Sequence, residues 1–207
     1  MTPRYFALIV GLCLTGACAI AAEEPAFTVS LAKADFEVRA YPALMVAEVA
    51  VSGDRKAAAS AGFRLLAGYI FGGNTARQKI AMTAPVMQAA SQKIPMTAPV
   101  MQSGGDGAWV ISFIMPKGST LENLPRPNNP RVQLKGIPPA RMAVVRFSGL
   151  ARPDSIAAKT AALQGFVSAQ HLHAIGPPAL AQYDPPWTLW FLRRNEVMIP
   201  IAPDAAT

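Results

Sequence analysis

The sequence is poor in cysteine, in histidine and in charge, and each shortage excludes a class of function. Both cysteines, Cys13 and Cys18, lie near the N-terminus, so the rest of the chain has no disulfide, thiolate metal site or thiol nucleophile. Charged residues make up only 15% of the chain, and the net charge of +7 is spread without a long run of like charges. Motifs for phosphate loops, serine hydrolases and zinc proteases are also absent. These shortages argue against nucleic-acid binding and against the common enzyme classes.

Long apolar runs are missing too, apart from one short run at the N-terminus. Residues 1–21 contain Arg4, the apolar run Tyr5 to Leu14 and a small-residue end, Ala19-Ile20-Ala21, in the order of a signal peptide. The run is shorter than the about 20 residues that span a bilayer as a helix. We therefore expect cleavage after Ala21, with processing at Ala22 as the alternative, export to the periplasm, and no transmembrane span after processing.

A second interpretation of the N-terminus concerns lipidation. Thr15-Gly16-Ala17-Cys18 loosely resembles the lipobox of bacterial lipoproteins, although Thr15 stands where that box has leucine. The minor alternative is a lipoprotein anchored through Cys18.

The remaining chain has the length and composition of one globular domain, because 52% of the residues are hydrophobic. We divide it into a lead-in at 22–35, a domain at 36–201 and a tail at 202–207. We expect a monomer.

The first half of the domain predicts strands followed by a helix. Phe36 to Val51 is apolar with alternation, and Asp54 is placed to cap a helix over Arg55 to Ile70, which Gly72-Gly73-Asn74 ends. On this helix one predicted face carries Phe63, Leu66 and Ile70, and Ala59 and Gly62 permit a close approach.

The second half repeats this order. Arg131 to Phe147 is strand-rich, and Asp154 is placed to cap a helix from Ser155 to about His171. Further short strands are predicted over three segments: Trp109 to Met115, Ala179 to Tyr183, and Glu196 to Ile201. Two helices among short antiparallel strands indicate the α+β class.

A short internal repeat precedes the middle strands. Lys79 to Gln88 and Lys93 to Gln102 differ only at Ala81 and Pro95, and each copy can form one strand of a hairpin. Its methionines, Met82 among them, suit either an adaptable ligand surface or the core.

The segment Tyr183 to Glu196 combines aromatic and basic residues. Trp187, Trp190 and Phe191 can stack on a flat π-system, while Arg193 or Arg194 can pair with carboxylates at its edge. Alternatively, the aromatics close one end of the core and the arginines pair with Glu196 or Asp184. The histidines, His171 and His173, are expected at the surface near a helix end, and no metal ligand is assigned.

Seven segments occur in the order found in the SOUL family of haem-binding proteins, which the chain resembles over roughly residues 30 to 201. They are Phe36 to Arg39, Tyr69 to Asn74, Lys79 to Val86, Phe113 to Pro116, Leu124 to Pro127, Tyr183 to Pro186 and Arg193 to Val197. The doubled Met-Thr-Ala-Pro-Val segment is similar to that of bacterial members in particular. The resemblance implies a distorted antiparallel β-barrel of two pseudo-symmetric halves flanked by two long helices.

The same resemblance implies binding of haem, non-covalently, or of another porphyrin in a shallow apolar groove. The groove would lie between the first helix and the loop before the last strand. The candidate contacts are Phe63, Arg64, Leu66, Ile70, Met82, Trp187, Trp190 and Arg193. Thr188 stands where some members have a propionate-binding lysine, and Ala40 lies near the place of an iron-binding histidine in some animal members.

The expected function is therefore a non-enzymatic haem carrier or buffer in the cell envelope. Two alternatives stay open. One is an enzyme acting on tetrapyrroles, for example by removing a metal, with Glu37, Asp184 or a histidine exchanging protons. The other is a general module for apolar ligands or partners.

Overall fold

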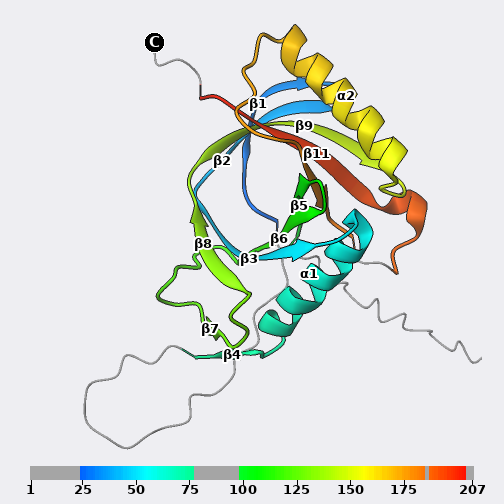
Figure 1. Ribbon diagram of the computed structural model, residues 1–207. Helices are drawn as coiled ribbons and strands as arrows, with labels where there is room; N and C mark the ends of the chain where they lie inside the picture. The colour runs from blue at the N-terminus through cyan, green and yellow to red at the C-terminus, as the bar shows by residue number, and fades with distance from the viewer. Residues whose placement is uncertain (1–23, 77–97, 185–186, 204–207) are drawn as a thin grey trace, which may run out of the picture.

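The computed structural model describes residues 24–76, 98–184 and 187–203, which form a curled antiparallel sheet with helices outside it (Figure 1). The main sheet contains β1 (Thr28–Lys33), β2 (Phe36–Tyr41), β3 (Leu44–Ser52), β5 (Val100–Gly105), β6 (Ala108–Ile114), β8 (Gln133–Ile137), β9 (Ala140–Ser148), β10 (Ala179–Gln182) and β11 (Arg194–Ile201). The other elements are the helices α1 (Arg55–Ile70) and α2 (Pro153–Ala169), the 3-10 helix η1 (Trp190–Leu192), and the paired strands β4 (Asn74–Thr75) and β7 (Arg126–Pro127).

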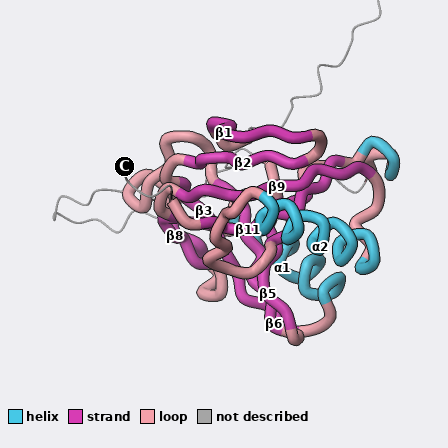
Figure 2. Tube along the Cα trace, turned by 90° about the horizontal axis from the view of Figure 1, so that it is seen from above, coloured by secondary structure: helices cyan, strands magenta, loops and turns pink. Residues whose placement is uncertain are grey.

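The strand order explains the division into two halves. It is β1-β2-β9-β11-β10-β5-β6-β3-β8, and each neighbouring pair is antiparallel. α1 packs on β3 and β6 at one end of the order, and α2 packs on β9 and β11 at the other. Figure 1 shows the two helices on the outside of the half-barrel, and Figure 2 shows the same elements from above. The predicted α+β class and distorted barrel are confirmed.

Side chains alternate between the two faces of the sheet, and both faces are largely buried. The face toward the helices contributes to two cores, one around Val49, Ile111 and Phe113 under α1 and one around Val145, Val197 and Ile199 under α2. The opposite face points into the half-barrel, where Tyr41, Val144, Ala181 and Met198 form a third cluster. Because successive residues of a strand face opposite sides, each strand supplies both environments.

α1 begins and ends as the sequence predicts. The Asp54 carboxylate accepts hydrogen bonds from the backbone N–H groups of Lys56 and Ala57, both at 3.0 Å, which satisfies donors that the first helical turn leaves unpaired. After the helix, Gly72 has a φ of 114°, a left-handed conformation that favours glycine.

α2 begins earlier than the sequence predicts. Its N-cap is Arg152, which makes no side-chain capping bond, and Asp154 lies in the first turn instead of capping. The predicted capping role of Asp154 is therefore wrong. Pro153 accounts for the shift, because proline at the first helical position needs no N–H partner and already has a helical φ.

Several predictions concern residues outside the described ranges. They include the signal peptide at 1–21, Met82, and most of the repeat from Lys79 to Gln102. The lead-in at 22–35 contributes β1, which pairs with β2. Among the described residues, no helix has the length and apolar character needed to cross a bilayer.

Two glycines of α1 test how closely the helix packs on the sheet. A Cβ on Gly62 would clash with Ile111 Cγ1, whereas a Cβ on Gly68 would have nothing within 4 Å. We expect Gly62→Ala to lower the free energy of unfolding by about 1–3 kcal/mol through overpacking. Gly68→Ala should raise it by about 1 kcal/mol, because alanine is the better helix former. Urea unfolding of both variants measures the difference, and equal effects of the two substitutions would contradict the close packing.

Candidate functional site

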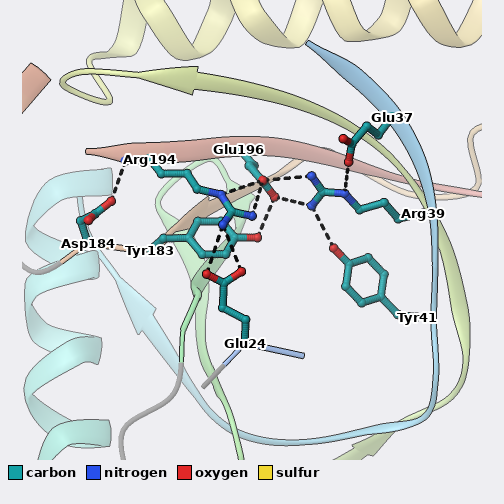
Figure 3. A network of polar contacts seen from close by, with 8 residues as sticks. All are labelled: Glu24, Glu37, Arg39, Tyr41, Tyr183, Asp184, Arg194 and Glu196. Atoms are coloured by element: carbon teal, nitrogen blue, oxygen red, sulfur yellow. Dashed lines mark hydrogen bonds and ion pairs between the residues drawn. The ribbon is translucent and has the colours of Figure 1, made fainter. Parts of the chain in front are cut away.

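The inner face of the half-barrel holds a network of charged side chains centred on Glu196. Arg39 donates to both carboxylate oxygens, from Nη1 to Oε2 at 2.7 Å and from Nη2 to Oε1 at 3.1 Å. Arg194 donates to Oε1 from Nη2 at 2.9 Å, and the Tyr183 hydroxyl donates to Oε2 at 2.7 Å. Figure 3 shows these side chains converging on Glu196. The Glu196 side chain has no exposed surface, and Arg39 is only 3% exposed.

The network extends outward from Glu196 in two directions. Arg39 Nε donates to Glu37 at 2.6 Å, and Arg194 Nη1 lies 3.0 and 3.1 Å from the two carboxylate oxygens of Glu24. Each guanidinium also lies over an aromatic ring, Arg39 over Phe27 at 4.3 Å and Arg194 over Tyr183 at 3.8 Å. The buried Arg39 and the partly buried Arg194 are thus each paired with two carboxylates and packed against one aromatic ring.

These contacts determine the protonation states of Glu196 and Tyr183. Burial alone would raise the pKa of Glu196, but hydrogen bonds from Arg39 and Tyr183 and the arginine charges outweigh it and lower the pKa. Burial and the neighbouring Glu196 charge raise the pKa of Tyr183, so its hydroxyl stays protonated and donates. Glu196 is therefore a structural anion at neutral pH.

A cavity of about 180 Å³ lies beside this network, inside the half-barrel. Its lining is mainly apolar: Pro25, Tyr41, Pro42, Leu44, Val46, Pro99, Met101, Ser112, Ile114, Ile137, Pro138, Ala140, Met142, Tyr183 and Met198. Tyr41 and Tyr183 belong to both the lining and the network.

The candidate residues on α1 lie in two different environments. Leu66 and Ile70 are 0% and 1% exposed and belong to the core under the helix, so neither is accessible to a ligand in this structure. Phe63 is 36% exposed with its ring edge against Phe113, and Arg64 is exposed. Of the three residues predicted to share one face of α1, Phe63 is therefore at the surface, while Leu66 and Ile70 are in the core.

The loop before β11 carries a cluster of exposed apolar side chains, here called the aromatic loop. Its exposed members are Trp187, Leu189, Trp190, Phe191 and Leu192, with Trp187 81% and Trp190 59% exposed. Arg193 Nε donates to the Thr188 carbonyl at 2.9 Å, which holds the base of the loop. Large exposed apolar side chains gathered in one short segment are typical of a binding site.

The segment 149–151 connects the aromatic loop with the start of α1. The Gly149 N–H donates to the Arg193 carbonyl at 3.1 Å, and Arg55 Nη2 donates to the Ala151 carbonyl at 2.8 Å. The loop base and the first residue of α1 are therefore held by the same short segment.

Each of the two interpretations of the Tyr183 to Glu196 segment is correct for part of it. Arg194 pairs with Glu196, and the Asp184 carboxylate accepts from the Arg194 backbone N–H at 2.6 Å, as the structural interpretation has it. The tryptophans are exposed instead of closing the core, as the binding interpretation has it.

Of the candidate proton-transfer groups, the two carboxylates accept hydrogen bonds from arginines and the two histidines are exposed to solvent. Glu37 pairs with Arg39, and Asp184 accepts from the backbone of Arg194. His171 and His173 are both exposed, and the described residues contain no group of three or more His, Cys, Asp or Glu side chains that could hold a metal.

Residues 22–200 match the sequence model of the SOUL heme-binding protein family. The chain belongs to the SOUL family. Membership identifies its relatives as haem-binding proteins, and the two outer helices on a curled sheet are the architecture expected for SOUL proteins.

Solved structures support this fold at low identity. The C-terminal domain of EcmrR is 11% identical with a TM-score of 0.54, and the match covers 85% of this SOUL chain and 98% of that domain. A hydrolase from Listeria innocua is 13% identical with a TM-score of 0.54, and the match covers 84% of this chain and 94% of that protein. No curated protein sequence matches this SOUL chain.

The Glu196 network was not predicted as a site of this SOUL protein, although the sequence contains its signal. Glu37, Arg39 and Tyr41 alternate along one strand, as Arg194 and Glu196 do along another, which predicts a common face for each set. What the sequence does not contain is the register that brings the two strands to β9 from opposite sides.

A charge deletion tests the network. Glu196→Gln leaves Arg39 and Arg194 without their shared buried anion, so we expect the free energy of unfolding to fall by about 3 kcal/mol. The matched control is Glu48→Gln, which removes an ion pair at 3.6 Å to a Lys135 side chain that is 58% exposed. That control should cost less than about 1 kcal/mol. Urea unfolding at neutral pH compares the two.

The pH dependence of stability tests whether the negative charge of Glu196 is responsible for this stabilisation. Because the folded pKa of Glu196 is lowered, its contribution is fully present above the ordinary value of 4.5 and is lost as pH falls through the lowered value. The difference between the wild type and Glu196→Gln should be constant from neutral pH to about 5 and shrink in more acid solution. A difference that does not change in acid would contradict an ionised Glu196.

Proposed function

We propose that this protein binds haem or a related tetrapyrrole at the aromatic loop, as a non-enzymatic carrier or buffer in the bacterial cell envelope. One observation carries the proposal: a member of a haem-binding family has two tryptophans on the surface of one loop, 81% and 59% exposed. Exposed indoles are costly in water and favourable against a flat π-system.

The energetics suit a shallow site. A porphyrin face is large and apolar, and each 100 Å² removed from water contributes about 2.5 kcal/mol before ordering costs. The propionates would be met at the rim by Arg64 on α1 and Arg193 at the loop base. Phe63 is the candidate for the facing wall, because its helix begins at the segment that also holds the loop base.

Removing the two indoles tests the site. Trp187→Ala with Trp190→Ala should weaken haem binding at least about tenfold, since the stacking surface is lost while the buried core is unchanged. The measurement is a haem titration followed by the Soret band. Phe71→Ala, which truncates another exposed aromatic at 60% exposure, is the matched control and should bind as the wild type does.

The histidines provide a second arm of the same titration. If no imidazole ligates the iron, His171→Ala with His173→Ala leaves the Soret maximum unchanged. Metal-free porphyrin should then bind with similar affinity. Wild-type affinity in the tryptophan variant would refute the proposed site, and an absence of any spectral change in the wild type would refute haem binding itself.

The location outside the cytoplasm is supported by residues 1–21 alone. We expect expression in a bacterial host to yield a periplasmic protein that begins at Ala22, which mass spectrometry of the intact purified chain measures. A chain beginning at an acylated Cys18 would favour the lipoprotein alternative, and an unprocessed cytoplasmic chain would contradict export.

A further inference from the structure

The cavity inside the half-barrel is distinct from the aromatic loop. Neither Trp187 nor Trp190 lines it. Its walls come from β3, β5, β6, β8, β9 and β11, together with two tyrosines and the segment at Pro25. Three methionines, Met101, Met142 and Met198, contribute flexible and polarizable walls. An apolar cavity of about 150 Å³ stays dry and binds benzene. At about 180 Å³, this one has room for an apolar body of that size.

A cation lies close to the cavity, against the ring of one of its lining residues, although Arg194 does not itself line the cavity. Tyr183 lines the cavity, and the Arg194 guanidinium lies 3.8 Å from the centre of its ring. Arg194 uses Nε and Nη2 for Glu196, at 3.1 and 2.9 Å, and directs Nη1 to the carboxylate of Glu24. The residue after Glu24 is Pro25, which itself lines the cavity. The Glu24 carboxylate thus occupies an anion position beside an apolar chamber.

The Glu24 contact differs from the rest of the network in its exposure. The Glu24 side chain is 42% exposed, whereas Glu196 is fully buried. An ion pair with a solvent-exposed partner contributes little to stability, so the Glu24 contact is the weakest held in the network. Glu24 and Pro25 also line a second cavity of about 150 Å³, which shares Pro25 with the first. Another carboxylate could replace that of Glu24 without changing the net charge around Arg194.

We propose that this cavity binds a small amphipathic monocarboxylate. An alkyl or aryl body of about six to eight carbons fills the apolar chamber. Its carboxylate takes the place of Glu24 at Nη1 of Arg194. The site shares no residue with the proposed haem surface, so either function can be present without the other.

The test uses calorimetric titration of the full chain with octanoate and with 1-octanol, which has the same chain length and no charge. Octanoate should bind more tightly than octanol. Glu24→Gln removes the competing carboxylate and should raise the octanoate affinity about two- to fivefold while leaving octanol unchanged. Glu24 lies at the surface end of the network, so this variant keeps the buried charges in place.

A cavity-filling pair locates the binding. Ala140→Leu projects into the chamber and should abolish binding of both probes, whereas Ala50→Leu, on an exposed position of β3, should not affect it. Ser112→Leu, at another lining position, repeats the test if the first variant does not fold. Equal affinity for octanoate and octanol, or no response to Glu24→Gln, would overturn the carboxylate position. Octanoate binding that survives the filled cavity would overturn the site, and haem titration of the same variants reports separately on the aromatic loop.

Discussion

A fully buried carboxylate, Glu196, holds together strands that are far apart in the sequence. Its donors come from β2, from β11 and from the residue that follows β10, so three parts of the sheet meet at one anion. Burying a single charge is costly, and the cost is offset only because each oxygen of this carboxylate accepts at least two hydrogen bonds. The same carboxylate orients Arg39 and Arg194, which also donate to Glu37 and Tyr41 and to Glu24, respectively. The polar chemistry of the inner face is therefore organised around this one carboxylate.

Both faces of the sheet carry buried side chains, so both must be covered. Two helices cover the outer face, and the curl of the sheet brings the inner face against itself. The curl does not close the inner space completely, and the apolar cavity is what is left between the strands. Its mainly apolar lining and the adjacent polar network divide the interior into two environments. An amphipathic ligand matches this division better than a purely apolar or a purely charged one.

Sequence alone could predict the local elements, because their signals are local. Asp54, the Ala- and Leu-rich stretch and the glycines that follow predict α1 with its observed bounds. The start of α2 was missed because two local signals compete there, and the helical φ of Pro153 prevailed over the capping ability of Asp154. Leu66 illustrates a different limit. Periodicity places it on the apolar face of α1, but only the packing of α1 on β3 and β6 shows that it is core and not surface. Similarly, alternation places Arg39 and Glu196 on inner faces, while the strand order that joins them is a long-range property.

The contrast between the aromatic loop and the core explains why a shallow haem surface is compatible with this fold. The two cores under the helices are complete without the loop: Leu66, Ile70 and Ile199 are each no more than 2% exposed. The apolar side chains of the loop therefore contribute little to folding stability, and their exposure costs hydration free energy in the free protein. A loop held at its base by Arg193 and Gly149 can keep these side chains exposed without disturbing the sheet. Retaining two indoles at such positions is understandable if a flat apolar ligand covers them, because the area it removes from water then offsets the cost of displaying them.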